Sequence, residues 1–566
     1  MTASATFSIG VDFGTNSVRA LVVDTATGEE IATAVHPYAA GMNGIILDDH
    51  DPNLARQDPA DYLAGFNASL AEAVTLAKAH PSFDPGRVVG IGVDTTGSTP
   101  IPVDRAGTAL GLLPEFRKEP AAMAWLWKDH TAHAEAAEIT DKARSAGLPY
   151  LSTCGGTYSS EWFWSKALHC ERTNPRVAKA AHSWVEQCDY VVGAVTGKTD
   201  PTSMSRGVCA AGHKAMYHPS WGGLPSAAFL EGLSPDFSRI REHYAHVAVP
   251  SDRVAGGLTP AIARAVGLPP NLPVAVGAID AHVGAVGCGI TPGTLVKIIG
   301  TSTCDCMVWP MNTPLADIPG VCGIVPESIL PGMHGIEAGQ SAVGDIFNWF
   351  VQRIAPSGYG SGDEMHRRLS EAASALAPGE SGLVALDWHH GNRTVLVDPL
   401  LTGLTVGQTL TTTPPEIYRA LIEATAFGAL TIIDRIQQHG VRIDEVINCG
   451  GIADKSPLTM QIYADVTNRP MKVSRSAQTC ALGAAIFGAV VGRAHASVAD
   501  AQRAMTAVKP HVFRPIPAHA DAYRRLFGIY SRLHDAFGVR GSSISLDGVM
   551  KELILIRQTA RAGRSG

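Results

Sequence analysis

Four short polar stretches of this chain combine the residue types that phosphoryl transfer requires. The first is Asp12, near the end of an apolar run, followed by the turn Gly14-Thr15-Asn16-Ser17. The second is Asp280, which also follows an apolar run. The third is the turn Gly300–Thr303, and the fourth is Gly450-Gly451 ahead of an expected helix. Phosphoryl transfer needs phosphate cradles, a divalent metal site, a base beside the acceptor hydroxyl and a nucleotide slot, and these stretches can supply each part.

The first stretch suits a phosphate and a cation. Glycine and asparagine tolerate the positive φ that tight hairpin turns often need, and such a turn can point several backbone N–H groups into one concavity. The Asp12 carboxylate has apolar neighbours and is costly there unless something pairs with it, as a hydrated Mg²⁺ would. On this stretch alone, an ordinary hairpin with one solvated aspartate remains the alternative.

Three other motifs lack the spacing that their chemistry demands. Gly193–Thr199 has three residues between its glycines, one fewer than a P-loop needs, and is interpreted as a polar turn. His130 and His133 lack the spacing and the acidic residue of a zinc-protease helix, which indicates a solvated helix face. Gly339–Gly344 is not the Gly-x-Ser-x-Gly elbow of a hydrolase.

Length and charge restrict the class of protein. With 566 residues the chain is too long for one core, so two large domains or more are expected. The formal net charge is −7 and no basic block is present, which argues against a nucleic-acid partner and fits a small-molecule enzyme. A homodimer is left open.

Cysteine spacing and hydropathy indicate a cytoplasmic protein. The ten cysteines include no Cys-x-x-Cys pair, and Cys304-Asp305-Cys306 has the wrong spacing for a zinc ribbon. Free thiols in a reducing compartment are therefore expected. No signal-like start and no apolar run of about 18 residues occur, so no membrane partner is expected.

The elements that must position the polar stretches alternate between strands and helices. The first part predicts strands at 7–13, 18–23, 29–36 and 88–95 and helices at 59–79 and 120–146, with irregular chain at 41–58 and loops at 196–225. The strand pair 294–299 and 304–309 repeats the design of the opening hairpin. This echo predicts two related α/β domains that face each other, each with a phosphate turn.

Taken in order, the four stretches resemble the signature set of the FGGY carbohydrate kinases. The matching segments are Asp12–Arg19, Gly277–His282, Gly300–Ser302 and Asn448–Gly451. Further segments are similar to the L-ribulokinase branch of that family: Gly92–Asp104, Gly212–His218, Gly300–Cys306, His334–Asp345 and Tyr530–Gly538. The resemblance runs from about residue 6 to residue 560, and each motif alone is weak.

The resemblance implies two ribonuclease-H-like (actin-like) α/β domains facing a central cleft. Residues 1–290 would carry the sugar site, the first phosphate turn and the catalytic aspartate, and residues 291–566 the nucleotide site and a helical tail, with Thr291–Gly293 as the hinge. The implied activity is ATP-dependent phosphorylation of L-ribulose to L-ribulose 5-phosphate in L-arabinose catabolism, with ATP and Mg²⁺ as cofactors.

The resemblance also implies roles for single residues. Asp280 would be the general base for the sugar hydroxyl, and Asp12 the Mg²⁺-side carboxylate, acting through water. The phosphate turns would be Gly14, Thr15, Asn16 and Ser17, then Gly300 and Thr301. The adenosine contacts would be Gly344, Asn348, Gly450, Gly451 and Lys455, although many family members carry an amide at the position of Lys455. The sugar contacts would be Gly97, Lys214, Asp280 and Glu337.

Plainer interpretations stay open for several of these residues. Asp280 could cap the next helix, Asn348 could be a solvated helix residue, and Lys214 could be a surface lysine. Glu337 could be buried and paired for structural reasons. Trp125 and Trp127 could stack on a sugar or belong to the packed face of a helix.

Two other functions compete with L-ribulose phosphorylation. The chain could phosphorylate another ketopentose or a polyol, such as D-ribulose or xylulose, or it could be an actin-like or chaperone-type ATPase, since this fold serves all three. The sugar-sized polar set of Asp280, Lys214 and Glu337 favours a kinase. The absence of a long substrate-binding extension after residue 500 also favours one.

Overall fold

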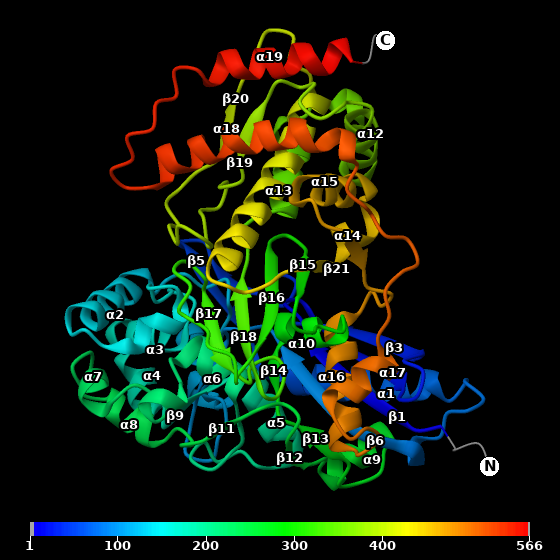
Figure 1. Ribbon diagram of the computed structural model, residues 1–566. Helices are drawn as coiled ribbons and strands as arrows, with labels where there is room; N and C mark the ends of the chain where they lie inside the picture. Colours follow the sequence, from blue (N-terminus) through cyan, green and yellow to red (C-terminus); the bar gives the residue numbers. More distant parts are fainter. Residues whose placement is uncertain (1–4, 564–566) are drawn as a thin grey trace.

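The computed structural model describes residues 5–563, which form two mixed sheets with helices around them (Figure 1). The first sheet has the order β12-β13-β6-β1-β2-β3, with β14 also paired to β6. Its strands are β1 (Phe7–Phe13), β2 (Ser17–Asp24), β3 (Glu30–Pro37), β6 (Val88–Thr95), β12 (Val254–Gly257), β13 (Pro273–Ala275) and β14 (Ala278–Ile279).

The second sheet has the order β17-β18-β16-β15-β21-β22. Its strands are β15 (Thr294–Ile299), β16 (Thr303–Pro310), β17 (Gly323–Pro326), β18 (Met333–Ala338), β21 (Glu445–Cys449) and β22 (Met471–Val473). In each sheet one central strand, β1 or β15, has an antiparallel hairpin on one side and a parallel strand on the other. The internal echo of the sequence is therefore confirmed as a repeat of topology.

Nineteen α-helices are assigned between residues 5 and 563. Those of the first half are α1 (Pro59–Ala77), α2 (His133–Ser145), α3 (Phe163–Thr173), α4 (Pro175–Ala180), α5 (Gln187–Thr196), α6 (Val208–Ala215), α7 (Ala227–Glu231), α8 (Phe237–Glu242), α9 (Pro260–Val266) and α10 (Asp280–Gly287). Those of the second half are α11 (Gly344–Trp349), α12 (Gly362–Ser374), α13 (Pro414–Gln438), α14 (Gly451–Lys455), α15 (Pro457–Thr467), α16 (Thr479–Val491), α17 (Val498–Met505), α18 (Ala520–Gly538) and α19 (Val549–Ala562). None of them is both long and apolar enough to cross a lipid bilayer.

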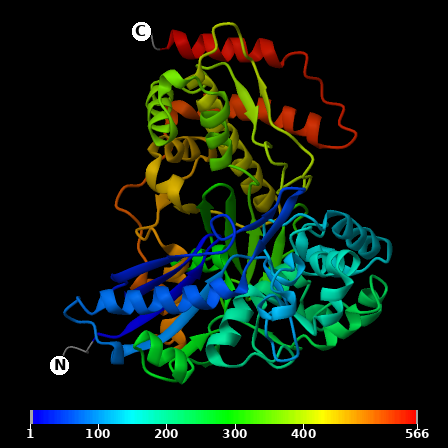
Figure 2. The same cartoon turned by 180° about the vertical axis from the view of Figure 1, so that it is seen from behind.

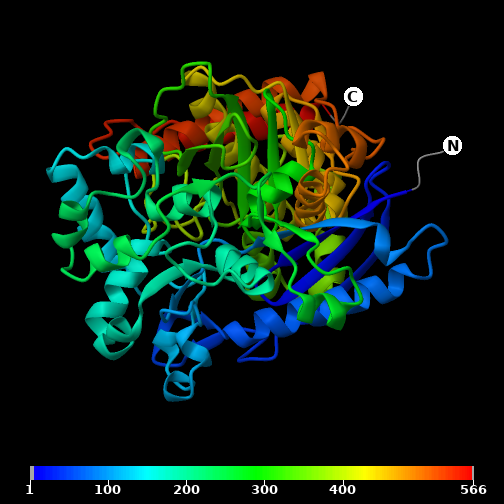
Figure 3. The same ribbon diagram turned by 90° about the horizontal axis from the view of Figure 1, so that it is seen from below.

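Short strands complete the fold outside the two sheets: β4 (Ile46–Asp48), β5 (Asp51–Gln57), β7 (Pro100–Val103), β8 (Ala124–Trp125), β9 (Ser183–Glu186), β10 (Arg206–Gly207), β11 (Ala248–Val249), β19 (Val384–Leu386) and β20 (Leu404–Val406). Helices α2 to α4 and α6 to α8 form a lobe with its own apolar core at one side of the first sheet (Figures 1 and 3). Seen from behind, α1 lies along the strands of that sheet (Figure 2).

Three stretches differ from the sequence prediction. Residues 41–58 contain β4 and β5, and the 120–146 helix begins only at His133. Before it, the Asp129 carboxylate accepts hydrogen bonds from Ala55 on β5 and from Thr131, so tertiary contacts hold this chain in turns. The loop predicted at 196–225 contains the helix α6, which is buried along its whole length. In each case contacts with distant residues decide the structure, and no local pattern reports them.

The two halves meet through α10 and α16, which pack against each other and against the first sheet. Glycines let the backbones approach closely here. A Cβ atom at Gly10 on β1 would lie 1.7 Å from the carbonyl oxygen of Ala481, and one at Gly92 on β6 would lie 1.9 Å from that of Ala484. A Cβ at Gly483 of α16 would lie 1.9 Å from the carbonyl oxygen of Val283 on α10. This contact therefore fixes both helices relative to the strand ends.

The glycine contact predicts a large cost for one methyl group. Gly10→Ala should lower the free energy of unfolding by about 3 kcal/mol or more, because the methyl group meets backbone that cannot turn aside. Urea unfolding followed by tryptophan fluorescence measures the change. The control is Gly528→Ala, because Gly528 lies within α18 with open space around it. That variant should gain about 0.5–1 kcal/mol. A wild-type midpoint for Gly10→Ala would contradict the close approach of α16.

Candidate active site

Three aspartates gather where neighbouring strands of the first sheet end. Asp12 on β1 and Asp94 on β6 are register partners, and Asp280 follows β14, whose Ala278 is paired with Asp94. Both carboxyl oxygens of Asp94 are buried, and within residues 5–563 their polar neighbour is the carboxyl group of Asp12 and not an N–H or hydroxyl donor. Parallel register therefore brings together three groups that lie far apart in the sequence.

Burial changes the acidity of all three carboxyl groups. Burial, and then the charge of Asp12, raises the pKa of Asp280 to about 7. The pKa of Asp94 is raised well above its usual range by burial and by its two neighbours. Burial also raises the pKa of Asp12, although Arg19 on β2 opposes this through a 2.8 Å ion pair. Carboxyl groups this close together repel one another when ionised. A hydrated divalent cation bound beside them would offset that repulsion.

The first turn, Gly14–Ser17, is closed by a backbone hydrogen bond of 3.0 Å from Gly14 to Ser17. Two neighbouring side chains hold Thr15 within it. The Gln57 amide donates to the Thr15 carbonyl at 2.7 Å, and the Trp127 indole donates to its hydroxyl at 3.1 Å. Asn16 lies exposed at the tip of the turn. The turn is thus held from below while its tip faces outward.

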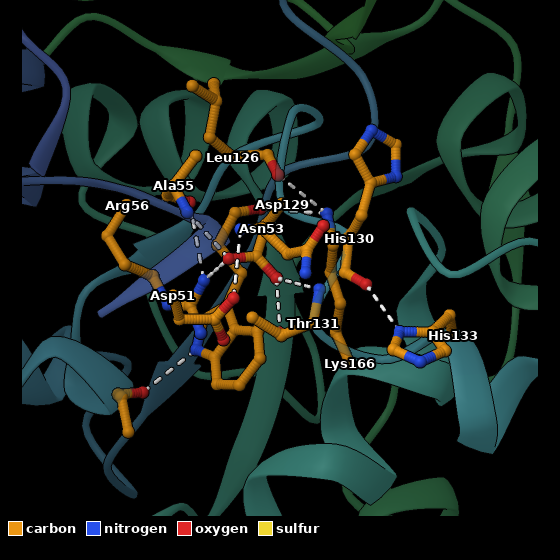
Figure 4. Close-up of polar contacts among 12 residues, drawn as sticks. Asp51, Asn53, Ala55, Arg56, Leu126, Asp129, His130, Thr131, His133 and Lys166 are labelled. Atoms are coloured by element: carbon orange, nitrogen blue, oxygen red, sulfur yellow. Dashed lines mark hydrogen bonds and ion pairs between the residues drawn. The ribbon is translucent and has the colours of Figure 1, made fainter. Parts of the chain in front are cut away.

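A buried polar network supports the loop that carries Trp127 (Figure 4). At its centre, Asp129 forms an ion pair with Arg56 and accepts hydrogen bonds from Ala55 and Thr131. The Arg56 guanidinium lies 3.4 Å from the centroid of the Trp125 ring, which is 1% exposed. Trp125 is therefore packed in the core, on a strand and not on a helix, and does not face a sugar.

Lys166 ties this loop to the residues around Gly97. Its ammonium group is buried and donates to the carbonyl oxygens of Trp125, Leu126 and Ser98 at 3.2, 2.9 and 3.0 Å. Gly97 itself packs against Ile279, since a Cβ there would lie 2.6 Å from an Ile279 side-chain carbon. The backbone at Gly97 therefore lies directly beside β14, the strand that precedes Asp280.

The second turn, Gly300–Thr303, is joined to the start of α11. Val343 donates to the Thr301 carbonyl at 2.7 Å, and Gly344 donates to that of Gly300 at 3.1 Å. Gly450 packs on the end of β15, where a Cβ would lie 2.5 Å from the Ile299 carbonyl oxygen, and its φ of 94° favours glycine. Three glycine-containing segments distant in the sequence thus converge on one spot.

The remaining predicted nucleotide residues lie further along two helices. Gly451 is the first residue of α14 and Lys455 is the last, and the Lys455 side chain is exposed. Asn348 follows Gly344 by one turn of α11, and its side-chain oxygen lies 2.9 Å from His366 Nε2. Asn348 is exposed, so its amide N–H groups remain free to donate to a ligand.

The predicted sugar contacts are held together at Asp280. Lys214 on α6 is 5% exposed, so it is not a surface lysine, and its ammonium lies 3.5 Å from Glu337 Oε2 on β18. The positive charge of Lys214 also lowers the pKa of Asp280 slightly, against the larger effect of burial. A base, a cationic donor and an anionic acceptor are therefore grouped at one place, as recognition of a polyhydroxylated molecule requires.

Sequence reasoning missed four residues of the site: Arg19, Asp94, His213 and His282. All four lie within quoted family segments but received no role. For Asp94 a signal was present, because an aspartate within an apolar strand is costly without a purpose. The partners of Arg19 and of the two histidines depend on strand register and helix packing, which the sequence does not report.

The chain matches models of two domains over most of its length. Residues 7–287 match the N-terminal domain of the FGGY family of carbohydrate kinases, and residues 295–491 match its C-terminal domain. A ribulokinase from Geobacillus thermodenitrificans is 41% identical, with 99% of this chain and 98% of that protein covered. One from Mycolicibacterium smegmatis is 42% identical over 94% of each.

Solved structures share the fold at lower identity. A xylulose kinase from Rhodospirillum rubrum has a TM-score of 0.76 at 24% identity, covering 94% of this chain and 98% of that chain. A Plasmodium falciparum glycerol kinase with ADP has the same TM-score at 14% identity, covering 95% and 99%. These likenesses establish the two-domain α/β fold.

The buried Arg56–Asp129 pair gives a stability prediction. Asp129→Asn keeps the shape and most hydrogen bonds but leaves the Arg56 charge uncompensated, so the free energy of unfolding should fall by about 3–5 kcal/mol. Asp141→Asn is the control, because it removes one partner of the exposed pair with Arg144 and should change stability by less than about 0.5 kcal/mol. Equal urea midpoints for the two variants would show that the Arg56–Asp129 ion pair does not stabilise the fold as proposed.

Proposed function

Because this chain belongs to the FGGY family of carbohydrate kinases, and so is an ATP-dependent sugar kinase, we propose that it is a ribulokinase. The proposed reaction transfers the γ-phosphoryl group of ATP to L-ribulose, giving L-ribulose 5-phosphate for L-arabinose catabolism. The observation that carries the proposal is one group of residues: Asp280, with a pKa of about 7, feels the charge of Lys214, whose ammonium lies 3.5 Å from Glu337 Oε2. The relatives that share about 40% identity over nearly the full length are ribulokinases, which supports the choice of sugar class.

Asp280 is proposed as the general base. It would accept the proton of the attacking sugar hydroxyl as that oxygen bonds to the γ-phosphorus. A base with a pKa near the working pH combines a useful ionised fraction with enough basicity to take the proton. Lys214 would donate to a sugar oxygen and Glu337 would accept from sugar hydroxyls, which orients one hydroxyl toward the base.

The two turns are proposed to hold the phosphates of ATP. Backbone N–H groups of Gly14–Ser17 and of Gly300–Thr301 would donate to phosphate oxygens, and Gly344, Asn348 and Gly450-Gly451 would line the adenosine. Asp12 and Asp94 fit an Mg²⁺ ion, because their buried carboxyl groups lack enough positive partners. When bound, this ion would offset negative charge on the phosphates.

The domain boundary stays at residues 290 and 291 in this proposal, with Thr291–Gly293 as the hinge between α10 and β15. Closure over both substrates would exclude water and so suppress hydrolysis of ATP. The cytoplasm is the proposed location. All ten cysteines are free thiols, which suits a reducing compartment, and ATP is the phosphoryl donor.

The proposed base predicts a specific pH dependence. Asp280 acts only when ionised, so kcat/KM for the sugar should rise with pH up to about 7 and level off above it. Asp280→Asn should lower kcat by roughly 10²–10⁴ and remove this limb, with little change in sugar binding. Steady-state assays of ADP release between pH 5.5 and 9 measure both effects. Near wild-type turnover in the variant would show that another group is the base.

The choice of sugar is tested with the four 2-ketopentoses. L-Ribulose should give the highest kcat/KM, and ADP release without sugar should be slow. A higher value for D-ribulose or a xylulose would favour the alternative substrate, and full turnover without sugar would favour an ATPase module.

Lys214→Met and Glu337→Gln should each lower kcat/KM for L-ribulose by roughly tenfold or more, because each leaves a polar group unpaired. The KM for ATP is the internal control and should stay nearly unchanged.

A further inference from the structure

Three polar side chains, from two helices, surround one buried oxygen atom of Glu337. His213 and Lys214 come from α6, His282 from α10 and Glu337 from β18; we call these four the Glu337 cluster. Glu337 Oε2 lies 3.4 Å from His213 Nδ1, 3.4 Å from His282 Nε2 and 3.5 Å from Lys214 Nζ. Three nitrogen atoms thus surround a single carboxylate oxygen that is shielded from solvent.

We infer that His282 is a positioning residue of the sugar site, whose protonated ring forms an ion pair with Glu337 Oε2 and leaves Oε1 to accept a sugar hydroxyl. This inference rests on the proposed function, because it takes Glu337 to be a sugar contact. His282 is two residues beyond Asp280 on α10, so the same helix carries the base and orients the sugar acceptor.

The hydrogen bonds of His213 show why the proton belongs to His282. Ser328 Oγ donates its only proton to the Val325 carbonyl at 3.1 Å, so it accepts from His213 Nε2, which lies 3.0 Å away. The Nδ1 atom of a neutral His213 ring then faces Glu337 as an acceptor and cannot bind its oxygen. Burial, with the nearby His282, lowers the pKa of His213 well below its usual range and keeps this ring neutral.

His282 has the opposite charge state. Both ring nitrogens are buried without a hydrogen bond to another described residue, and Nε2 lies 3.4 Å from Glu337 Oε2, within ion-pair distance. Although burial alone would lower it, Cys209 and Glu337 raise the pKa of His282 well above its usual range. The His213 and His282 rings lie with their centroids 4.4 Å apart. The neutral ring therefore packs against the charged one and limits its movement.

A transition-metal ion could in principle bind the same atoms. The ligand atoms of His213, His282 and Glu337 lie within 4.8 Å of one another, and two histidines with a glutamate are a known zinc ligand set. The Lys214 ammonium at the same oxygen would repel a second cation and already supplies positive charge. Together with the His282 proton, it accounts for a pKa of Glu337 well below the usual range, despite burial. Lys214 and protonated His282 therefore offset the charge of Glu337 without a metal ion.

One consequence is a fixed acceptor for the sugar. No group within residues 5–563 donates a hydrogen bond to Glu337 Oε1, whereas Oε2 is enclosed by nitrogen atoms. A carboxylate held at one oxygen cannot rotate to follow a misplaced hydroxyl. Loss of the His282 proton should therefore weaken sugar binding and also reduce the preference for one 2-ketopentose over its epimers.

The test compares two substitutions at His282 in the full-length protein. His282→Leu removes the donor, whereas His282→Gln keeps an N–H group at the position of Nε2. We expect His282→Leu to raise the KM and the calorimetric Kd for L-ribulose about tenfold or more, with the KM for ATP changed less than about twofold. His282→Gln should restore both sugar constants to within about threefold of wild type. The control is His80→Leu, which removes a half-exposed histidine beyond α1 and should leave both KM values unchanged.

Several outcomes would overturn the inference. An unchanged KM for L-ribulose in His282→Leu would do so, as would equal defects in the Leu and Gln variants or parallel losses of sugar and ATP binding. A metal site would be indicated if Zn²⁺ at about the protein concentration inhibited L-ribulose binding to the wild type and a chelator reversed the inhibition. Zn²⁺ should then have no such effect on His282→Gln. If the wild-type protein does not bind L-ribulose, the proposed function fails separately, and the Leu and Gln variants are compared on whichever 2-ketopentose the panel identifies.

Discussion

Close backbone contact between α16 and the first sheet is the constraint on which the active site depends. Gly10 and Gly92 leave no room for a side chain against Ala481 and Ala484, and Gly483 makes the same approach to α10. Because Asp280 begins α10, the position of that helix decides where the proposed base lies relative to Asp12. The site is thus assembled by helix packing as much as by strand register.

Charge is distributed unevenly around this contact. On the phosphate side, the carboxyl groups of Asp12 and Asp94 are buried, and Arg19 is their one ion-pair partner among the described residues. On the sugar side, one carboxylate is surrounded by Lys214 and two imidazole rings. The first arrangement attracts a cation, and the second holds an anion in a fixed orientation. Asp280 lies between the two sides. Burial and the charge of Asp12 raise its pKa, and the charges of His282 and Lys214 lower it.

The sequence predicted the fold where local patterns were strong. Buried strands such as Phe7–Phe13 are rich in apolar residues, and turn residues marked Gly14–Ser17 and Gly300–Thr303, so the two-sheet design could be predicted. Helix α6 could not, because its small and polar residues are helical only when enclosed by the lobe. Lys214 was identified through family resemblance, whereas His282 needed the packing of three elements to reveal its partner.

Helix α16 comes from the second half of the chain but packs on the first sheet, and this affects how the chain folds during its synthesis. The face of β1 and β6 that carries Gly10 and Gly92 is covered by a helix ending at Val491, roughly 400 residues further along. At about 5–20 residues per second, this face waits about 20–80 s on the ribosome for its cover. The first sheet can form early but cannot finish packing until nearly the whole chain has been translated. Native packing of this sheet therefore waits for α16, and nascent chains present an unfinished surface to chaperones throughout that interval.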